Sequence, residues 1–373
     1  MRTDDVSPAL DEPPVPGVTE VARAHTGGHA FVGGRLLRRE EREAELAAVL
    51  APGATRPVGA GNRARPEAAD PYRLCFERDL DRVKHSRPWR RLAGKCQVFV
   101  APEDDHLRTR LTHAVEVAQV ATGIARVVNL CVPLVEAIAL AHDCGHGPAG
   151  HASEEAFSPY LADGGYDHAV YGADVTLAPL NLCSETLDGV RNHSWRRPTP
   201  RTPEGEVVAW ADRIAYVCHD FEDAVRAGIL IPDDLPDAVR DVVGARRSQQ
   251  IGTFVHAVLD AVEATGSVGM TEPAASALAA FRSFNFERIY LRAAAVRQAE
   301  RVVLLLRGLV EHFADTPHRL TEVVLGSSPA PDAGSPAAAA LAVHYVSGMT
   351  DRFALGLGVE LLGWRPDDLP RGV

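Results

Sequence analysis

The sequence predicts a mainly α-helical fold, with at most a small β-hairpin. Apolar residues recur at intervals of three and four over several long segments, as they do on the buried face of a helix. No alternation of period two is long enough for a large sheet, and no internal repeat is found. With 373 residues, 46% of them hydrophobic and 24% charged, the chain can bury a sizeable core.

The clearest predicted helices cover residues 107–128, 134–142 and 206–220. Further helical patterns run over 284–291, 299–313 and 337–357, and a short charged helix could form within 36–50. Residues 94–102 favour an extended segment and could form one arm of a hairpin. Proline and glycine clusters punctuate the first 70 residues. We therefore expect a loosely structured extension over 1–70 and one helical domain over 71–373.

The charge of the chain restricts its partners. A net charge of −11 argues against a general nucleic-acid coat or an anionic membrane surface as the main partner. The basic stretch 78–91 leaves a weak nucleic-acid contact open, although a solvated helix face explains it equally well. No run of about 18 apolar residues is present and the N-terminus has no secretory pattern, so we expect no membrane contact and a cytoplasmic protein.

Residues 142–154 hold the densest group of metal-binding and proton-transferring side chains. His142, Asp143, His146 and His151 are followed by Glu154, and an apolar helical run leads directly into His142. Metal ligands need such rigid support, because imidazole and carboxylate must be held in place to coordinate one ion. The alternative is a histidine-rich loop on a solvated surface.

Two other predicted helices supply matching groups. Arg110 and His113 are three residues apart and share one face, although an isolated histidine there would most often belong to the core. Asp212 shares a face with Tyr216 and Asp220 amid apolar neighbours. A partly buried carboxylate needs a cation or several donors, so Asp212 indicates a metal, a helix cap or an arginine partner.

The order His113, His142-Asp143, Asp212 on separate helices resembles that of the HD-domain metal phosphohydrolases. Further motifs resemble the dGTPase family of deoxynucleoside triphosphate triphosphohydrolases, and they lie at 78–86, 90–98, 108–113, 136–143, 180–187, 212–220 and 348–352. The resemblance spans residues 72–357. It implies a helical fold, a homo-oligomer, and hydrolysis of a deoxynucleoside triphosphate (dNTP) to deoxynucleoside and inorganic triphosphate by water attack on the α-phosphorus.

The resemblance also implies roles for particular residues. The metal ligands would be His113, His142, Asp143 and Asp212, a set suited to Mn²⁺, Mg²⁺, Fe²⁺, Ni²⁺ or Zn²⁺. His151 and Glu154 would form the catalytic pair, in which Glu154 fixes the tautomer of His151. The substrate contacts would be Arg110, His146, His168, Arg213 and Tyr216 for phosphates, Gln97 for the sugar 3′-hydroxyl, and Tyr216 again for the ribose.

Several positions depart from the family pattern. Gly147 and Ala149 stand where proline and phenylalanine are usual, Ala169 and Tyr171 lie where asparagine and glutamine are usual, and His344 replaces an acidic residue. These departures favour one alternative, an HD-type nucleotide monophosphatase or phosphodiesterase acting on a modified or pathway-specific nucleotide. A second alternative is a non-catalytic sensor of nucleotides or nucleic acid, against which the complete ligand set and His151 with Glu154 argue.

Overall fold

The computed structural model describes residues 22, 24, 25, 32–102, 104–162, 165–320, 329–370 and 372. The chain divides into two compact units, Met1–Leu37 and Arg38–Val373. Most of the first unit lies outside the described residues, and with it most of the predicted N-terminal extension. The second unit contains all the helices named below. The predicted division at residue 70 stays a prediction, although helix formation begins earlier, at Arg39.

The prediction of an all-α fold is confirmed. Within the described ranges no strand forms, and only the isolated bridges Arg63–Cys183 and Cys96–Thr109 occur. The hairpin expected around 94–102 is therefore limited to one bridge. The α-helices are α1 Arg39–Val49, α2 Cys75–Lys84, α3 Arg87–Arg91, α4 Arg110–Val127, α5 Val132–Ala141, α6 His151–Phe157, α7 His168–Tyr171, α8 Ser184–Asn192, α9 Pro203–Arg226, α10 Asp237–Val243, α11 Arg247–Thr265, α12 Ala274–Asn285, α13 Ala293–Asp315, α14 Pro336–Ser347 and α15 Asp351–Leu362.

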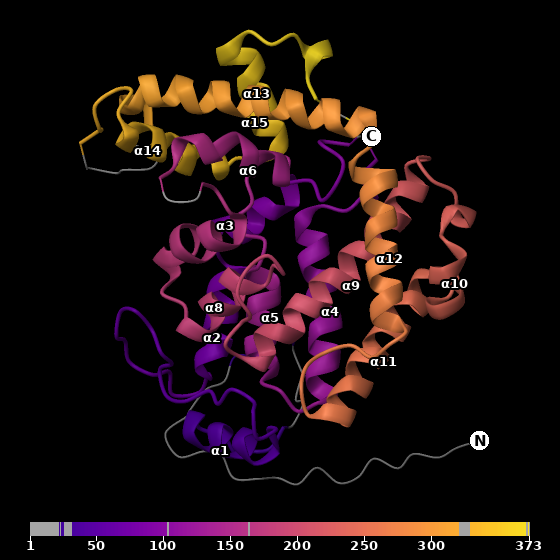
Figure 1. Ribbon diagram of the computed structural model, residues 1–373. Helices are drawn as coiled ribbons and strands as arrows, with labels where there is room; N and C mark the ends of the chain where they lie inside the picture. Colours follow the sequence, from indigo (N-terminus) through magenta and orange to yellow (C-terminus); the bar gives the residue numbers. More distant parts are fainter. Residues whose placement is uncertain are drawn as a thin grey trace. The chain divides into compact units, whose positions relative to one another are not determined.

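Helices α4, α5 and α9 pack on one another and build the larger of two apolar clusters (Figure 1). The α4 helix begins where the Thr109 hydroxyl accepts a hydrogen bond from the Thr112 amide. The α5 helix is buried on nearly every side, which explains why its sequence is apolar all round rather than striped. The α9 helix starts with Thr202 as N-cap and Pro203 in its first turn.

The second apolar cluster surrounds α13, which packs against α6, α14 and α15 (Figure 1). Phe157 of α6, Leu309 of α13 and Val343 of α14 are fully buried there. The segment between α5 and α6 connects the two clusters, and this segment is residues 142–150 of the predicted motif. The motif therefore lies between the two packed apolar clusters. No helix among the described residues is both long and apolar enough to cross a membrane.

A buried ion pair fixes α8 against α2. The Asp79 carboxylate is fully buried and lies 2.6 Å from Nη1 of Arg63. Its other oxygen accepts hydrogen bonds from the Cys183 amide at 2.8 Å and the Thr186 hydroxyl at 2.7 Å. The start of α8 therefore depends on this carboxylate. The helix ends at Asn192, and His193 is its C-cap residue.

We predict that Asp79→Ala destabilises the protein by about 3–5 kcal/mol, because it leaves a buried guanidinium without its counter-charge. Urea unfolding followed by circular dichroism measures this change. The matched control is Asp81→Ala on the same helix, whose carboxylate is 47% exposed and pairs with Arg73 at 2.7 Å. That surface pair contributes about 1 kcal/mol or less. Equal losses for the two variants would contradict the role assigned to Asp79.

Candidate metal centre

The predicted metal ligands lie close together: His113, His142 and Asp143 offer ligand atoms within 4.8 Å of one another, and Asp212 lies beside both histidines. His113 comes from α4, His142 and Asp143 end α5, and Asp212 comes from α9. Nε2 of His113 lies 3.1 Å and Nε2 of His142 3.7 Å from Oδ1 of Asp212. Nε2 of His142 also lies 3.5 Å from Oδ1 of Asp143. Two atoms bound to one ion at about 2.1 Å can be at most about 4.2 Å apart, so these separations fit a shared cation.

His142 shows that the donor set suits a cation. It is the C-cap residue of α5, and its Nδ1 donates a hydrogen bond of 2.7 Å to the Ala139 carbonyl. That bond fixes the proton on Nδ1 and leaves a lone pair on Nε2, which is buried and has no hydrogen-bond partner. Two imidazoles and two carboxylates are ligands for a borderline-to-hard divalent ion. The residues present therefore fit a divalent metal.

Both carboxylates of the set are held in the ionised form. Burial alone would raise the pKa of Asp212, but the hydrogen bond from His113 and the electrostatic effect of the neighbouring His142 ring outweigh it and lower the pKa to about 2. Burial likewise opposes ionisation of Asp143, whereas His142 and Arg110 hold its pKa well below the usual range. Nη1 of Arg110 lies 2.7 Å from Oδ2 of Asp143. Arg110, predicted as a phosphate contact, is thus also the counter-charge of a predicted ligand.

Glycine is required beside that arginine. Gly150 has φ of +62°, and a Cβ there would collide with the Arg110 guanidinium. The residue ends the motif segment and serves as N-cap of α6. A side chain at this position would therefore displace Arg110 from Asp143.

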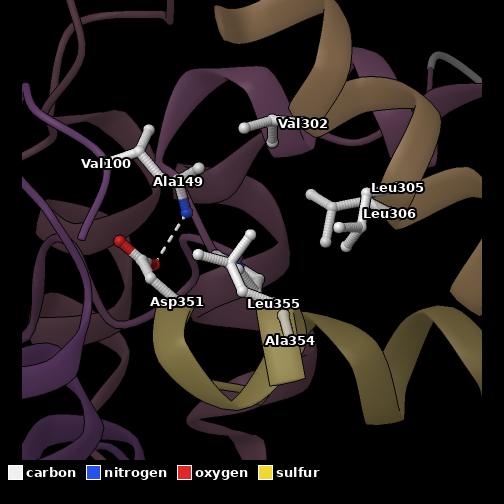
Figure 2. Close-up of a pocket in the computed structure, with 9 residues that line it drawn as sticks. Val100, Ala149, Val302, Leu305, Leu306, Asp351, Ala354 and Leu355 are labelled. Carbon is white, nitrogen blue, oxygen red and sulfur yellow. Dashed lines mark hydrogen bonds between the residues drawn. The ribbon is translucent and has the colours of Figure 1, made fainter. Parts of the chain in front are cut away.

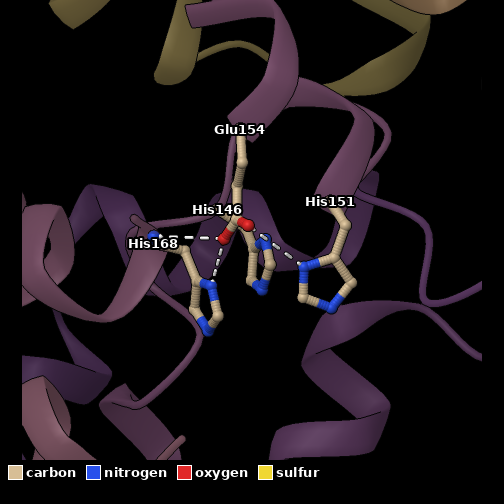
Figure 3. A group of neighbouring side chains, drawn as sticks. All are labelled: His146, His151, Glu154 and His168. Atoms are coloured by element: carbon tan, nitrogen blue, oxygen red, sulfur yellow. Dashed lines mark hydrogen bonds and ion pairs between the residues drawn. The ribbon is translucent and has the colours of Figure 1, made fainter. Parts of the chain in front are cut away.

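A second group of side chains lies beside the four ligands. His146, His151, Glu154 and His168 each offer one ligand atom within 4.8 Å of the others (Figure 3). The predicted pair is present, with Nδ1 of His151 3.5 Å from Oε2 of Glu154. The other oxygen of Glu154 accepts hydrogen bonds from Nδ1 and the backbone amide of His168, a contact that we did not predict. Glu154 thus orients two histidines at once.

The histidines of this group differ in exposure. The His151 side chain is 73% exposed, whereas His146 and His168 are buried and stack with ring centroids 3.7 Å apart. Burial and the charge of Arg110 hold the pKa of His146 well below its usual range. Burial opposes protonation of His168 as well, but the hydrogen bond to Glu154 prevails and raises its pKa. His151 is therefore the member of the group best placed to exchange protons with an incoming ligand.

The sequence analysis missed His193. This buried residue is the C-cap of α8, and its Nε2 lies 3.2 Å from Nε2 of His168. It also groups with His142 and Asp212 within 4.8 Å. Burial and the charges of His142 and His168 lower its pKa to about 4. No helix predicted above ends at His193, so no local signal in the sequence pointed to it.

Two predicted substrate contacts, Arg213 and Tyr216, have other partners in the structure, and a third, Gln97, has a buried oxygen without a partner. The Arg213 guanidinium lies over the Trp195 ring at 3.3 Å, and the Tyr216 hydroxyl accepts a hydrogen bond of 3.0 Å from Nε of Arg282. Gln97 follows the bridge at Cys96, and its side-chain oxygen is buried without a partner. A buried acceptor of this kind is available to a donor such as a hydroxyl. These three roles stay predictions.

Two of the departures from the family pattern, Ala149 and Tyr171, pack against the second apolar cluster. The Tyr171 hydroxyl and Nδ1 of His344 share a hydrogen bond of 3.3 Å. The Ala149 amide donates to Asp351 at 2.8 Å, and Ala149 has a left-handed φ of 58°. An apolar cavity of about 10 Å³ lies between Ala149, α13 and α15 (Figure 2). Such a small dry space is a packing gap and has no room for a substrate.

Comparison with known proteins assigns the family. Residues 110–217 match the HD domain, and residues 268–358 match the phosphohydrolase-associated domain. A deoxyguanosinetriphosphate triphosphohydrolase-like protein from Caldanaerobacter subterraneus is 38% identical over 85% of this chain and 92% of its own length. Proteins of the same description from Clostridium perfringens and Paracoccus denitrificans are 38% and 32% identical, over 67% and 84% of this chain and 77% and 100% of their own lengths.

Among solved structures, a hypothetical protein from Aquifex aeolicus matches with a TM-score of 0.46 at 15% identity, over 77% of this chain and 68% of that one; this likeness bears on neither fold nor function. The HD model covers the motif segment together with α4 and most of α9, which contain all four predicted ligands. The match and the curated relatives confirm the resemblance. The chain is a phosphohydrolase and belongs to the deoxyguanosinetriphosphate triphosphohydrolase-like family of HD-domain proteins.

Proposed function

We propose that the protein hydrolyses a dNTP, dGTP or another, to deoxynucleoside and inorganic triphosphate by water attack on the α-phosphorus. The observation that carries the proposal is the grouping of His113, His142 and Asp143, with Asp212 3.1 Å from His113 and 3.7 Å from His142, beside the Glu154 group. The names of the relatives support a guanine deoxynucleotide as one substrate to test.

A divalent ion, Mn²⁺ or Mg²⁺ or another transition metal such as Fe²⁺, Ni²⁺ or Zn²⁺, would polarise a phosphoryl oxygen and lower the pKa of a water when bound to these four residues. The chain itself supplies the fixed geometry. Helices α4, α5 and α9 place the four side chains before any ligand arrives, so little reorganisation is needed on binding.

His151 and Glu154 are the groups that we propose move the proton. Attack of water forms a new bond from oxygen to the α-phosphorus and breaks the bond from phosphorus to the 5′-oxygen. The 5′-oxygen then needs a proton. Nδ1 of His151 faces Glu154, so a protonated His151 can deliver the proton from Nε2 at the exposed rim of the site, and the attacking water releases a proton that restores the balance. Glu154 keeps the ring oriented during the transfer.

The remaining predicted residues would bind the substrate. Arg110 and His146 are buried beside Asp143, where charge from a phosphate would be stabilised. Gln97 would accept from the sugar hydroxyl, Tyr216 would pack against the ribose, and Arg213 and His168 would contact phosphates. Tyr216 is held by Arg282, which would restrict the space open to a 2′-hydroxyl.

The predicted partners other than nucleotide remain proposals. Part of the basic stretch 78–91 is neutralised within the chain, because Arg78 and Arg82 pair with Glu67 and Lys84 pairs with Glu136. The weak nucleic-acid contact would fall to the rest of the stretch, which includes Arg87, Arg90 and Arg91. We retain a homo-oligomer and a cytoplasmic location as expectations from the family resemblance and the sequence.

A nucleotide monophosphatase or phosphodiesterase is the second candidate function. The contact between Tyr171 and His344 favours it, because both positions depart from the family pattern and they touch each other. The two departures therefore differ as a unit from the family pattern. The metal ligands are the same for either reaction.

We expect purified protein with Mn²⁺ or Mg²⁺ to convert at least one dNTP to deoxynucleoside and intact triphosphate. The measurement is anion-exchange analysis of products from each dNTP, ribonucleoside triphosphate and nucleoside monophosphate. Orthophosphate from monophosphates alone would replace the proposal by the second candidate. Bound metal without turnover of any nucleotide in the panel would contradict both.

Asp212→Ala should abolish tight metal binding and reduce turnover by at least about 10²-fold, because a ligand with its charge is lost. Metal content by elemental analysis and the product assay measure the two effects. His256→Ala, on an exposed position of α11, is the matched control and should change neither. An Asp212→Ala protein with full metal content would show that Asp212 is no ligand.

His151→Ala should lower kcat about 10²–10⁴-fold while the metal content stays at the wild-type level, because only proton transfer is removed. Single-turnover kinetics at saturating dNTP separate this effect from weaker binding. Glu154→Gln should give a smaller loss in the same step. Wild-type kcat in His151→Ala would exclude the residue from the chemistry.

A further inference from the structure

The Trp195 ring is held in one orientation although it lies at the surface. The residue stands in the segment between α8 and α9, two positions after His193, and it is 46% exposed. Its Nε1 donates a hydrogen bond of 3.1 Å to the Ala209 carbonyl of α9. The ring also meets the Trp210 ring nearly edge-on, with the centroids 4.7 Å apart. Two contacts with α9 therefore fix an aromatic surface that solvent can still reach.

This fixed ring lies on the guanidinium of Arg213. The guanidinium carbon is 3.3 Å from the ring centroid, and Arg213 directly follows the predicted metal ligand Asp212 on α9. A guanidinium is attracted to the face of an aromatic ring and stacks on it through its own plane. The N–H groups lie in that plane and point outward from its edge. The stacked arginine therefore keeps its hydrogen-bond donors for another partner.

Arg213 lacks the carboxylate partner that buried arginines elsewhere in the chain have. Arg110 pairs with Asp143 at 2.7 Å, and Arg63 pairs with Asp79 at 2.6 Å. Within the part of the chain that the structure describes, Arg213 forms no ion pair, and its Nε is buried without a hydrogen-bond partner. Removing an unpaired charge from water is costly, so a half-buried cation of this kind indicates an anionic ligand.

A second arginine of the same kind lies beside Tyr216. Tyr216 is three residues after Arg213 and shares its helix face, and the Tyr216 hydroxyl accepts a hydrogen bond of 3.0 Å from Nε of Arg282. Arg282 lies over the Phe286 ring at 4.3 Å and, among the described residues, also forms no ion pair. Aromatic rings thus hold both guanidinium groups where acids would otherwise neutralise them. A ligand with several negative charges suits such a place.

We propose that Trp195 is a positioning residue, which holds the Arg213 guanidinium in place to bind the triphosphate group of the substrate. The inference rests on the proposed function, in which Arg213 contacts a phosphate. The indole covers one face of the guanidinium and the Ala209 carbonyl fixes the indole, so Arg213 is oriented before the substrate arrives. Trp195 acts through Arg213 and takes no part in the chemical step.

The test measures binding of inorganic triphosphate to the full chain by calorimetry in the presence of Mg²⁺, so that no turnover is needed. Trp195→Leu keeps an apolar side chain but removes the ring, and it should weaken binding about 3- to 30-fold, the range of a cation–π contact. Trp195→Phe keeps a ring over Arg213 and should retain most of the affinity. The matched control is Trp364→Leu, which should bind as the wild type does. Trp364 lies 6.0 Å from Arg301, an arginine that pairs with Asp368 at 3.4 Å.

A double-variant comparison separates positioning from a purely structural role. If Trp195 acts through Arg213, Trp195→Leu should cost no further affinity for triphosphate in a chain that already carries Arg213→Ala. In the otherwise wild-type chain, Trp195→Leu should raise the KM for a dNTP by the same factor as the triphosphate dissociation constant. The kcat should stay at the wild-type level, because only binding that the ground state shares with the transition state is weakened. Urea unfolding verifies that each variant is folded.

Several results would overturn the role of Trp195. These are no binding of triphosphate to the wild-type chain, wild-type affinity in Trp195→Leu, equal losses in Trp195→Leu and Trp195→Phe, or a further loss when Trp195→Leu is added to Arg213→Ala. None of them bears on dNTP hydrolysis by the wild-type chain, so the proposed function would stand. A wild-type chain that hydrolyses no dNTP, but binds triphosphate through Trp195 and Arg213, would reject the proposed function and keep the binding role.

Discussion

The burial of the Asp143 carboxylate is the constraint on which the rest of the site depends. A buried carboxylate is costly unless cations and donors surround it, and here Arg110 lies at 2.7 Å while His142 and His146 lie at 3.5 and 3.3 Å from its other oxygen. One oxygen therefore faces a permanent cation and the other faces imidazoles only. The arrangement makes the second oxygen the natural ligand for a metal, since the first is already satisfied.

The fold meets this constraint by ending helices at the site. Asp143 follows α5, His193 follows α8, and His151 begins α6, so backbone geometry sets where each side chain starts. Long helices α4 and α9 pass beside these ends and contribute His113 and Asp212 from their sides. The buried Arg63–Asp79 pair acts at a distance, because it fixes the start of the helix whose end carries His193. Stability and site geometry are thus linked through α8.

Helices and local motifs could be predicted from the regular spacing of residues in the sequence, whereas contacts between distant residues could not. Helical spacing identified α4, α5 and α9, and the order of His113, His142, Asp143 and Asp212 led to a set that the fold brings together. His193 was not predicted as part of the site, because its partners His142 and His168 are 51 and 25 residues away and no spacing rule connects them. The hydrogen bond between Glu154 and His168 was not predicted for the same reason. Contacts of Gln97, Arg213 and Tyr216 depend on tertiary packing, which periodicity does not report.

The departures Ala149 and Tyr171 contact other helices than the predicted metal ligands do. Ala149 contacts α15 through Asp351, and Tyr171 contacts α14 through His344. The ligands instead face α4, α8 and α9. Lys95 connects the motif segment to α14, since its buried amine donates to the carbonyls of His146 and Ser347. Changes at Ala149, Tyr171 and His344 can therefore alter the contacts with α14 and α15 while the carboxylates and imidazoles keep their geometry. A family built in this way can vary what it binds without altering how its metal is held.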